Sequence, residues 1–167
     1  LPGWATGEVV PGDLYRFVKN APSTIAIKVN GKDIPYSLDK GYAVISRDWK
    51  KGDIITLTLP MEVKEVASKE TIKANEGRIA LQRGPLVYCV EGADNDGQAW
   101  HFVVPENTQY KSQFNSGLLN GIVTIQASVP AVSIGADGLS INTQTKTITA
   151  IPYYSWCNRG SNPMQVW

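Results

Sequence analysis

The chain has 167 residues, enough for one domain or two small ones, with 43% hydrophobic and 19% charged residues and a formal net charge of +1 at pH 7. This composition excludes a mainly disordered chain, and the sequence has no run of about 18 apolar residues that could form a transmembrane helix. Sixteen basic side chains against fifteen acidic ones leave no positive excess for binding nucleic acid, so we expect neither nucleic acid nor a membrane as partner.

The composition favours β-structure. Val, Ile and Thr account for 40 residues, and 15 Gly and 10 Pro are spread along the whole chain. Side chains branched at Cβ fit a pleated surface, and frequent Gly and Pro interrupt long helices. The best helical candidate, residues 68–76, is too short and polar to be stable alone.

In the first half, apolar runs separated by turn residues predict strands at 25–29, 34–38, 42–46, 54–59 and 61–67. Asn30-Gly31 lies between the first two runs and predicts a tight hairpin, because both positions of such a turn require φ > 0. Within 54–59, alternation places Ile55, Leu57 and Leu59 on the inner face and the two Thr hydroxyls outside. Residues 6–23 lack periodicity and are expected to form a loop.

In the second half, the same reasoning predicts strands at 78–82, 86–91, 99–104, 122–129, 131–134 and 145–154. Either Leu86 or Val87 must face the core. Segments 91–98 and 107–119 are expected to be loops, the second with room for one strand. Short strands at regular spacing, with Gly or Asn turns between them, predict an all-β fold built as an antiparallel β-sandwich.

Polar residues accumulate at 66–75, which divides the chain into residues 1–67 and residues 68–167. The first part is thin for a complete sandwich, so we expect it to be the C-terminal part of a truncated sandwich, followed by a second sandwich. The chain begins at Leu1 without a Met and ends at Trp167, which suggests a piece of a longer protein.

The residues that carry chemistry are few, and we assign no catalytic and no metal-binding residue. His101, the one histidine, has no nucleophile motif beside it and is expected to be an ordinary hydrogen-bonded strand residue. Cys89 and Cys157 are either a disulfide or two thiols, with burial favoured for Cys89. The run 94–97 departs from a calcium loop and fits a polar turn. Acidic residues are scattered, and their spacing selects no catalytic pair.

Aromatic residues are the remaining signal. The chain has five Trp and seven Tyr. Exposed rings can stack on sugars, although packing in a core or against another domain explains most such residues. The candidates for carbohydrate binding are Trp100, Tyr110 and Tyr153.

The sequence also resembles a known family. The sequence motifs on which the resemblance rests are LPGWA at 1–5, WKKGDIITLTLP at 49–60, GRIALQRGPLVYCVE at 77–91 and ITAIPYYSWCNRGSNPMQVW at 148–167. Together they resemble the C-terminal β region of glycoside hydrolase family 127, the β-L-arabinofuranosidase family. The resemblance spans nearly the whole chain and is weaker at 6–23 and 94–120.

The resemblance implies a parent with an (α/α)6 barrel followed by two β-sandwiches. In the family, a cysteine nucleophile on a zinc ion, held by cysteines and a glutamate, acts in the barrel. No part of this chain resembles that barrel, so no zinc is expected here, and Cys89 and Glu91 match the sandwich motif instead.

We therefore expect a non-catalytic region that supports a missing barrel, its partner, in a periplasmic or extracellular glycosidase. The alternative is a carbohydrate-binding module, and a plant-type glycan is the implied ligand. An enzyme in its own right would need a site that the sequence does not show.

Overall fold

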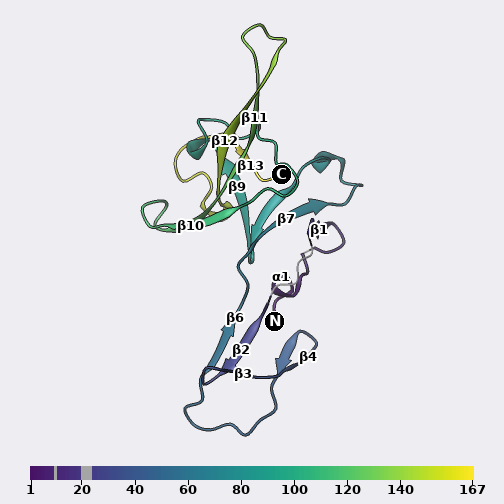
Figure 1. Ribbon diagram of the computed structural model, residues 1–167, viewed down its shortest axis with the longest axis vertical. Helices are drawn as coiled ribbons and strands as arrows, with labels where there is room; N and C mark the ends of the chain where they lie inside the picture. The colour runs from purple at the N-terminus through teal and green to yellow at the C-terminus, as the bar shows by residue number, and fades with distance from the viewer. Residues whose placement is uncertain (10, 20–23) are drawn as a thin grey trace.

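The structure, a computed structural model, describes residues 1–9, 11–19 and 24–167. The described chain is elongated, with a small group of strands at one end, a larger sheet in the middle and a long hairpin at the other end (Figure 1). Strands dominate, as predicted. Helical turns are limited, in the described residues, to α1 (Gly3–Thr6), η1 (Lys73–Asn75), η2 (Gly92–Asp94) and η3 (Tyr153–Ser155). None of them is long or apolar enough to cross a membrane.

The small group of strands contains two antiparallel units. Strands β2 (Ala26–Val29), β3 (Lys32–Asp33) and β6 (Ile55–Thr58) form a sheet in the order β3-β2-β6, and β4 (Ser37–Asp39) pairs with β5 (Tyr42–Val44). The turn between β2 and β3 has φ of 53° at Asn30 and 79° at Gly31, which confirms the predicted hairpin. The Asn30 side chain also binds Asp53 and the backbone N–H of Ile54, so the turn is tied to the start of β6.

The prediction that Ile55 and Leu57 point into a core is wrong for the described chain. Both lie on the same face as Ile27 and Val29, because these residues are paired across β2 and β6. Ile27 is only 6% exposed, whereas Ile55 is 54% exposed. The apolar face of this sheet is therefore covered over β2 and left open over its edge strand β6.

The larger sheet is antiparallel throughout and runs in the order β1-β7-β8-β9-β12-β11-β10, with β13 paired to β9. Its strands are β1 (Tyr15–Phe17), β7 (Val63–Ser68), β8 (Ala80–Arg83), β9 (Leu86–Glu91), β10 (Lys111–Asn115), β11 (Ile122–Ile134), β12 (Ile141–Pro152) and β13 (Met164–Gln165). Strand β9 has the predicted bounds, whereas β1 lies inside the segment expected to be a loop. Strand β10 is the one allowed for in 107–119.

Apolar side chains cover both faces of the central strands β9 and β12. Tyr88 packs with Ile125 and Ala150 on one face, while Cys89 packs with Ile122 and Ile151 on the other. Burial on both faces follows from the near-continuous apolar sequence of β9, and it places the core of the sandwich at these two strands.

The hairpin of β11 and β12 extends beyond this core. Its paired residues run from Ile125 with Ala150 out to Ile134 with Ile141. The sequence predicted two strands separated at Pro130, but β11 continues through it, and the Pro130 carbonyl accepts a hydrogen bond from the Val103 N–H. Segment 99–104, predicted as a strand, contributes only an isolated bridge at Phe102.

Helix α1 and the segment between β6 and β7 approach the larger sheet at a glycine turn. Gly84 lies between β8 and β9 with φ of 57°, and a Cβ added there would meet the side chains of Met61 and Trp4. The division of the chain at residue 67 stays a prediction. In hydrogen bonding, β7 pairs with β1 and β8 and therefore belongs to the larger sheet.

Candidate functional site

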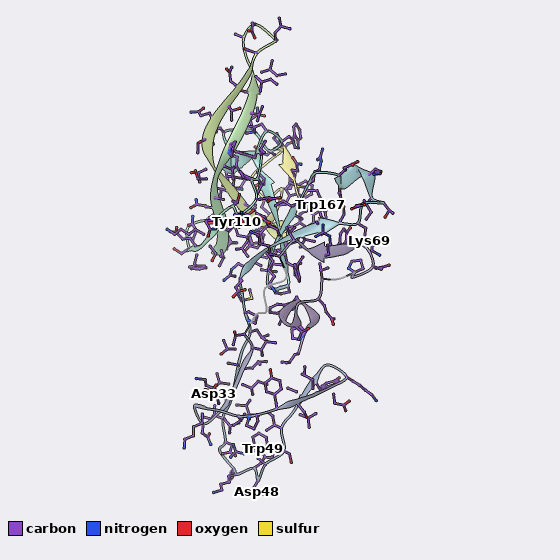
Figure 2. All side chains as sticks on the ribbon, turned by 45° about the vertical axis from the view of Figure 1, so that its right-hand side comes forward. Asp33, Asp48, Trp49, Lys69, Tyr110 and Trp167 are labelled. Carbon is purple, nitrogen blue, oxygen red and sulfur yellow. The ribbon has the colours of Figure 1, made fainter. Side chains whose placement is uncertain are left out.

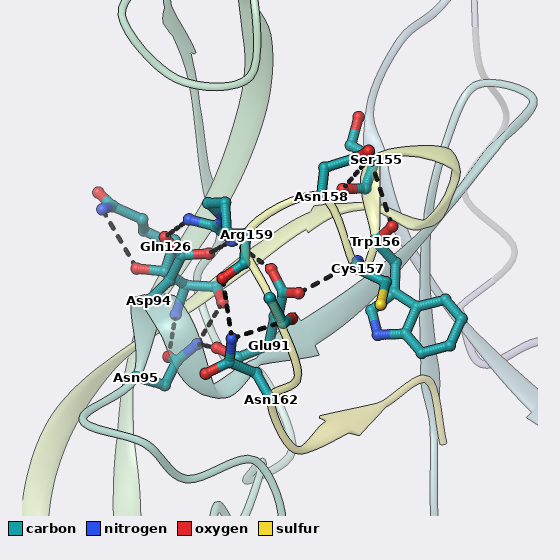
Figure 3. Close-up of polar contacts among 12 residues, drawn as sticks. Glu91, Asp94, Asn95, Gln126, Ser155, Trp156, Cys157, Asn158, Arg159 and Asn162 are labelled. Atoms are coloured by element: carbon teal, nitrogen blue, oxygen red, sulfur yellow. Dashed lines mark hydrogen bonds and ion pairs between the residues drawn. The ribbon is translucent and has the colours of Figure 1, made fainter.

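The most densely connected polar cluster lies where β9 runs into η2. Glu91 ends β9 with its side chain fully buried, and Asp94 closes η2. The Arg159 guanidinium lies between them: Nη1 donates to Asp94 Oδ1 at 2.6 Å, and Nη2 donates to Asp94 Oδ2 at 2.5 Å and to Glu91 Oε2 (Figure 3). Hydrogen bonds to Asp94, and after them those to Glu91, hold the pKa of Arg159 above its ordinary value.

Backbone groups complete this cluster. The Cys157 N–H donates to the second Glu91 oxygen, Oε1, at 3.2 Å. The buried Asn95 amide donates to the carbonyls of Glu91 and Thr149 and accepts from the Thr149 N–H, so it fastens η2 to β12. The prediction of a polar turn at 94–97 is confirmed, and its acids are paired with cations, because Asp96 binds Lys146 at 2.9 Å.

This cluster braces a loop and is not arranged as a catalytic pair of carboxylates. A general acid and a nucleophile need free carboxyl oxygens facing a substrate. Here both Glu91 oxygens and both Asp94 oxygens accept hydrogen bonds from the protein. The arrangement connects the contiguous segment formed by β9 and η2 with the loop that follows η3, because Arg159 lies 65 residues beyond Asp94 in the sequence.

The zinc ion implied by the family resemblance does not fit these residues. Glu91 is already bound by an arginine, and Cys89 is buried in an apolar cluster with Ile122 and Ile151. Among the described residues, no group of three His, Cys, Asp or Glu side chains could hold a metal ion.

The two cysteines are free thiols and not a disulfide. Cys89 is buried in β9, whereas Cys157 is exposed in the loop after η3. Of the two alternatives that the sequence left open, the structure selects separate thiols, with Cys89 buried as favoured.

We expect the folded chain to react with one equivalent of a thiol reagent such as Ellman's reagent at pH 8. Cys157 is exposed, while Cys89 is shielded and stays protonated because burial raises its pKa to about 12. The second equivalent should react only after unfolding in guanidinium chloride. Reaction of neither thiol, with two released by a reductant, would instead indicate a disulfide.

The three candidate sugar-binding residues lie in different surroundings. Tyr110, which is labelled in Figure 2, is partly buried. Its hydroxyl donates to Glu65 Oε1 at 2.7 Å, and burial raises its pKa. The Trp100 ring is exposed, and its indole N–H donates a hydrogen bond to the Met164 carbonyl at 3.4 Å. Tyr153 lies in η3 and is the one of the three whose ring, in the described chain, stacks on another aromatic ring, that of Trp156.

The Tyr153 and Trp156 rings are parallel within 3°, with centroids 6.1 Å apart. One turn of 3₁₀-helix has three residues, which places residues i and i+3 on the same side. η3 therefore brings the two rings together, and the Trp156 N–H donates to the Tyr153 carbonyl at 3.1 Å. The sequence analysis missed this pairing, although the spacing of three was visible.

His101 differs from its prediction. It lies outside the named strands, with its ring 4.1 Å from that of Phe102, and its buried Nδ1 has no hydrogen-bond partner. Its backbone carbonyl accepts from the Val132 N–H at 2.8 Å. The side chain therefore packs against its neighbour and makes no hydrogen bond through Nδ1.

Comparison with known proteins places this arrangement in a class of carbohydrate-active enzymes. Residues 63–167 match the model of the glycoside hydrolase family 127 C-terminal domain, and residues 1–61 match that of the β-L-arabinofuranosidase, GH127 middle domain. The chain thus belongs to glycoside hydrolase family 127, as its sequence motifs indicated.

Relatives of known activity or structure are much longer than this chain. A non-reducing end β-L-arabinofuranosidase of Bifidobacterium longum subsp. longum is 30% identical over 99% of the chain and 24% of its own length. A solved GH127 β-arabinofuranosidase superposes with a TM-score of 0.93 at 36% identity, over the whole chain and 26% of its own. The GH127 β-L-arabinofuranosidase of Geobacillus stearothermophilus T6 gives 0.80 at 34% identity, over 88% and 25%. The chain spans about a quarter of these proteins.

Proposed function

We propose that residues 1–167 are an accessory, non-catalytic part of a β-L-arabinofuranosidase-type glycosidase and support a catalytic barrel formed by another part of the polypeptide. One observation carries the proposal: the chain aligns along nearly its whole length with about a quarter of such enzymes, in their middle and C-terminal domains. The engagement of the Glu91 and Asp94 carboxylates by Arg159 is consistent with a structural role for the most connected polar cluster.

Exposed apolar side chains in the small strand group support a docking role. Six of them lie on or next to β4, β5 and β6, and each is at least 46% exposed: Leu38, Tyr42, Val44, Ile54, Ile55 and Leu57. Several exposed large apolar side chains in one part of a protein are characteristic of an interface. The barrel, as the partner in this proposal, would cover part of this surface.

The substrate proposed for the whole protein is supported by the relatives, which are β-L-arabinofuranosidases. We propose that the whole protein acts on plant-type glycans that carry L-arabinofuranose. We also propose that it is located in the periplasm or outside the cell, where such polymers occur. This proposal places the zinc ion implied by the family resemblance in the barrel.

The test is an activity assay of the 167-residue chain with a chromogenic β-L-arabinofuranoside. We expect no hydrolysis above the buffer rate, because the acids of the central cluster are bound to Arg159. The positive control is a full-length family relative assayed in parallel. Turnover by the chain alone, persisting through purification, would overturn the proposal.

A second function, carbohydrate binding, is favoured by one observation, the parallel and half-exposed rings of Tyr153 and Trp156. It is compatible with the accessory role, since a domain can both support a catalytic barrel and hold a glycan.

A further inference from the structure

The surface at η3 presents two aromatic rings in a fixed relation to each other. Tyr153 is 46% exposed and Trp156 is 39% exposed, and their planes differ by only 3°. Rings packed into a core would be buried, and neither of these is. Each ring therefore has surface open to solvent beside a parallel neighbour.

The buried polar cluster holds this pair in place. Trp156 is followed directly by Cys157, whose N–H binds Glu91, and shortly afterwards by Arg159, which binds Glu91 and Asp94 (Figure 3). The Asn158 side chain adds bonds to the carbonyls of Ser155 and Trp156. The loop that carries Trp156 is thereby tied to β9, so the ring pair loses little conformational entropy when a ligand binds.

The chemistry of this surface suits a neutral ligand with a flat apolar face. The Glu91–Arg159–Asp94 cluster beneath the loop pairs two carboxylates with one guanidinium and so keeps a formal charge of −1, which disfavours an anionic ligand. A sugar ring offers C–H groups on one face for contact with an aromatic ring and hydroxyl groups at its rim that can stay hydrated. Stacking of this kind requires only the flat face of the ring and so does not depend on a specific hydrogen-bond pattern.

We propose that Tyr153 and Trp156 form a platform that binds a neutral oligosaccharide, with sugar rings stacked on the two aromatic rings. This proposal rests on the carbohydrate-binding function named above and locates it at η3. It assigns Trp156 as a binding residue that the sequence did not single out, and it assigns the Glu91–Arg159 cluster as the brace that positions it.

The experiment is a titration of the ¹⁵N-labelled 167-residue chain with linear arabinotriose, followed by NMR. The chain contains five Trp, and the Trp156 indole signal is identified by its loss in Trp156→Ala. We expect a saturable shift of this signal. L-Arabinose should bind more weakly than arabinotriose, because it occupies one ring only.

The variants make the test specific. Trp156→Ala and Tyr153→Ala should each weaken binding by about tenfold or more, the effect of losing one stacking ring, whereas Tyr153→Phe keeps the ring and the affinity. Trp49→Ala is the matched control, because that indole is 47% exposed in the small strand group under Arg47, and its loss should leave binding unchanged. If Trp156→Ala fails to fold, the two Tyr153 variants decide.

Two results would overturn the platform. One is the absence of any saturable shift with arabinotriose or with cellotriose, which would assign the rings to a protein contact. The other is equal weakening by Trp49→Ala and Trp156→Ala. Because binding is measured on the chain without any catalysis, a negative result here leaves the activity assay and the accessory role to be judged separately.

Discussion

Replacing Arg159 by Met is expected to destabilise the chain by about 3–5 kcal/mol, the loss typical of removing one partner from a buried ion pair. Glu91 is fully buried and would lose its cationic partner. The free energy of unfolding from urea denaturation measures the effect. The matched control is Lys73→Met, which removes an ion pair whose two side chains are both largely exposed and should cost less than about 1 kcal/mol.

The double variant Glu91→Gln with Arg159→Met separates charge from packing. It removes the unpaired charge at the fully buried Glu91, although Asp94 still lacks its arginine, so it should be more stable than Arg159→Met alone. If Arg159→Met unfolds at the same urea concentration as Lys73→Met, the cluster does not brace the loop as described.

The second large effect is expected at the first residues of strand β9. Leu86 packs against the cluster of Tyr88, Ile125 and Ala150, whereas Val87 points the other way and is 42% exposed. Leu86→Asp should therefore cost about 3 kcal/mol or more, because it places an unpaired charge against the core. Val87→Asp should cost less than about 1 kcal/mol.

Thermal unfolding of the two variants measures this difference directly. They introduce the same side chain at neighbouring positions, so each is the control for the other. A larger drop in melting temperature for Val87→Asp would contradict the placement of Leu86 against the core and of Val87 at the surface.

Features set by neighbouring residues could be predicted from the sequence. The Asn30-Gly31 hairpin was, because its turn requires two positive φ angles that these residues accept readily. Strand β9 was predicted because its apolar run is bounded by Gly and Pro on one side and by a polar loop on the other. The family followed from motifs distributed along the whole chain.

Features set by residues that are distant in the sequence could not be predicted from it. Glu91 and Arg159 meet only when β9, η2 and the loop after η3 come together, and nothing local marks them as partners. Strand β11 continues through Pro130, and the Pro130 carbonyl accepts a hydrogen bond from the Val103 N–H. This contact comes from a segment distant in the sequence, so a local rule about proline could not predict it. Alternation correctly put Ile55 on an apolar face but could not show that the face is open over β6.

The β11–β12 hairpin has a consequence for the order of folding. Its ten consecutive pairs are closed by a short turn at 135–140, in which Asp137 accepts hydrogen bonds from the N–H groups of Leu139 and Ser140. Closing a short loop costs little chain entropy, whereas β9 reaches β12 only across a long stretch of sequence, through pairs such as Cys89 with Ile151. The hairpin can therefore form first and serve as the template on which β9, and with it the loop bearing Trp156, assembles.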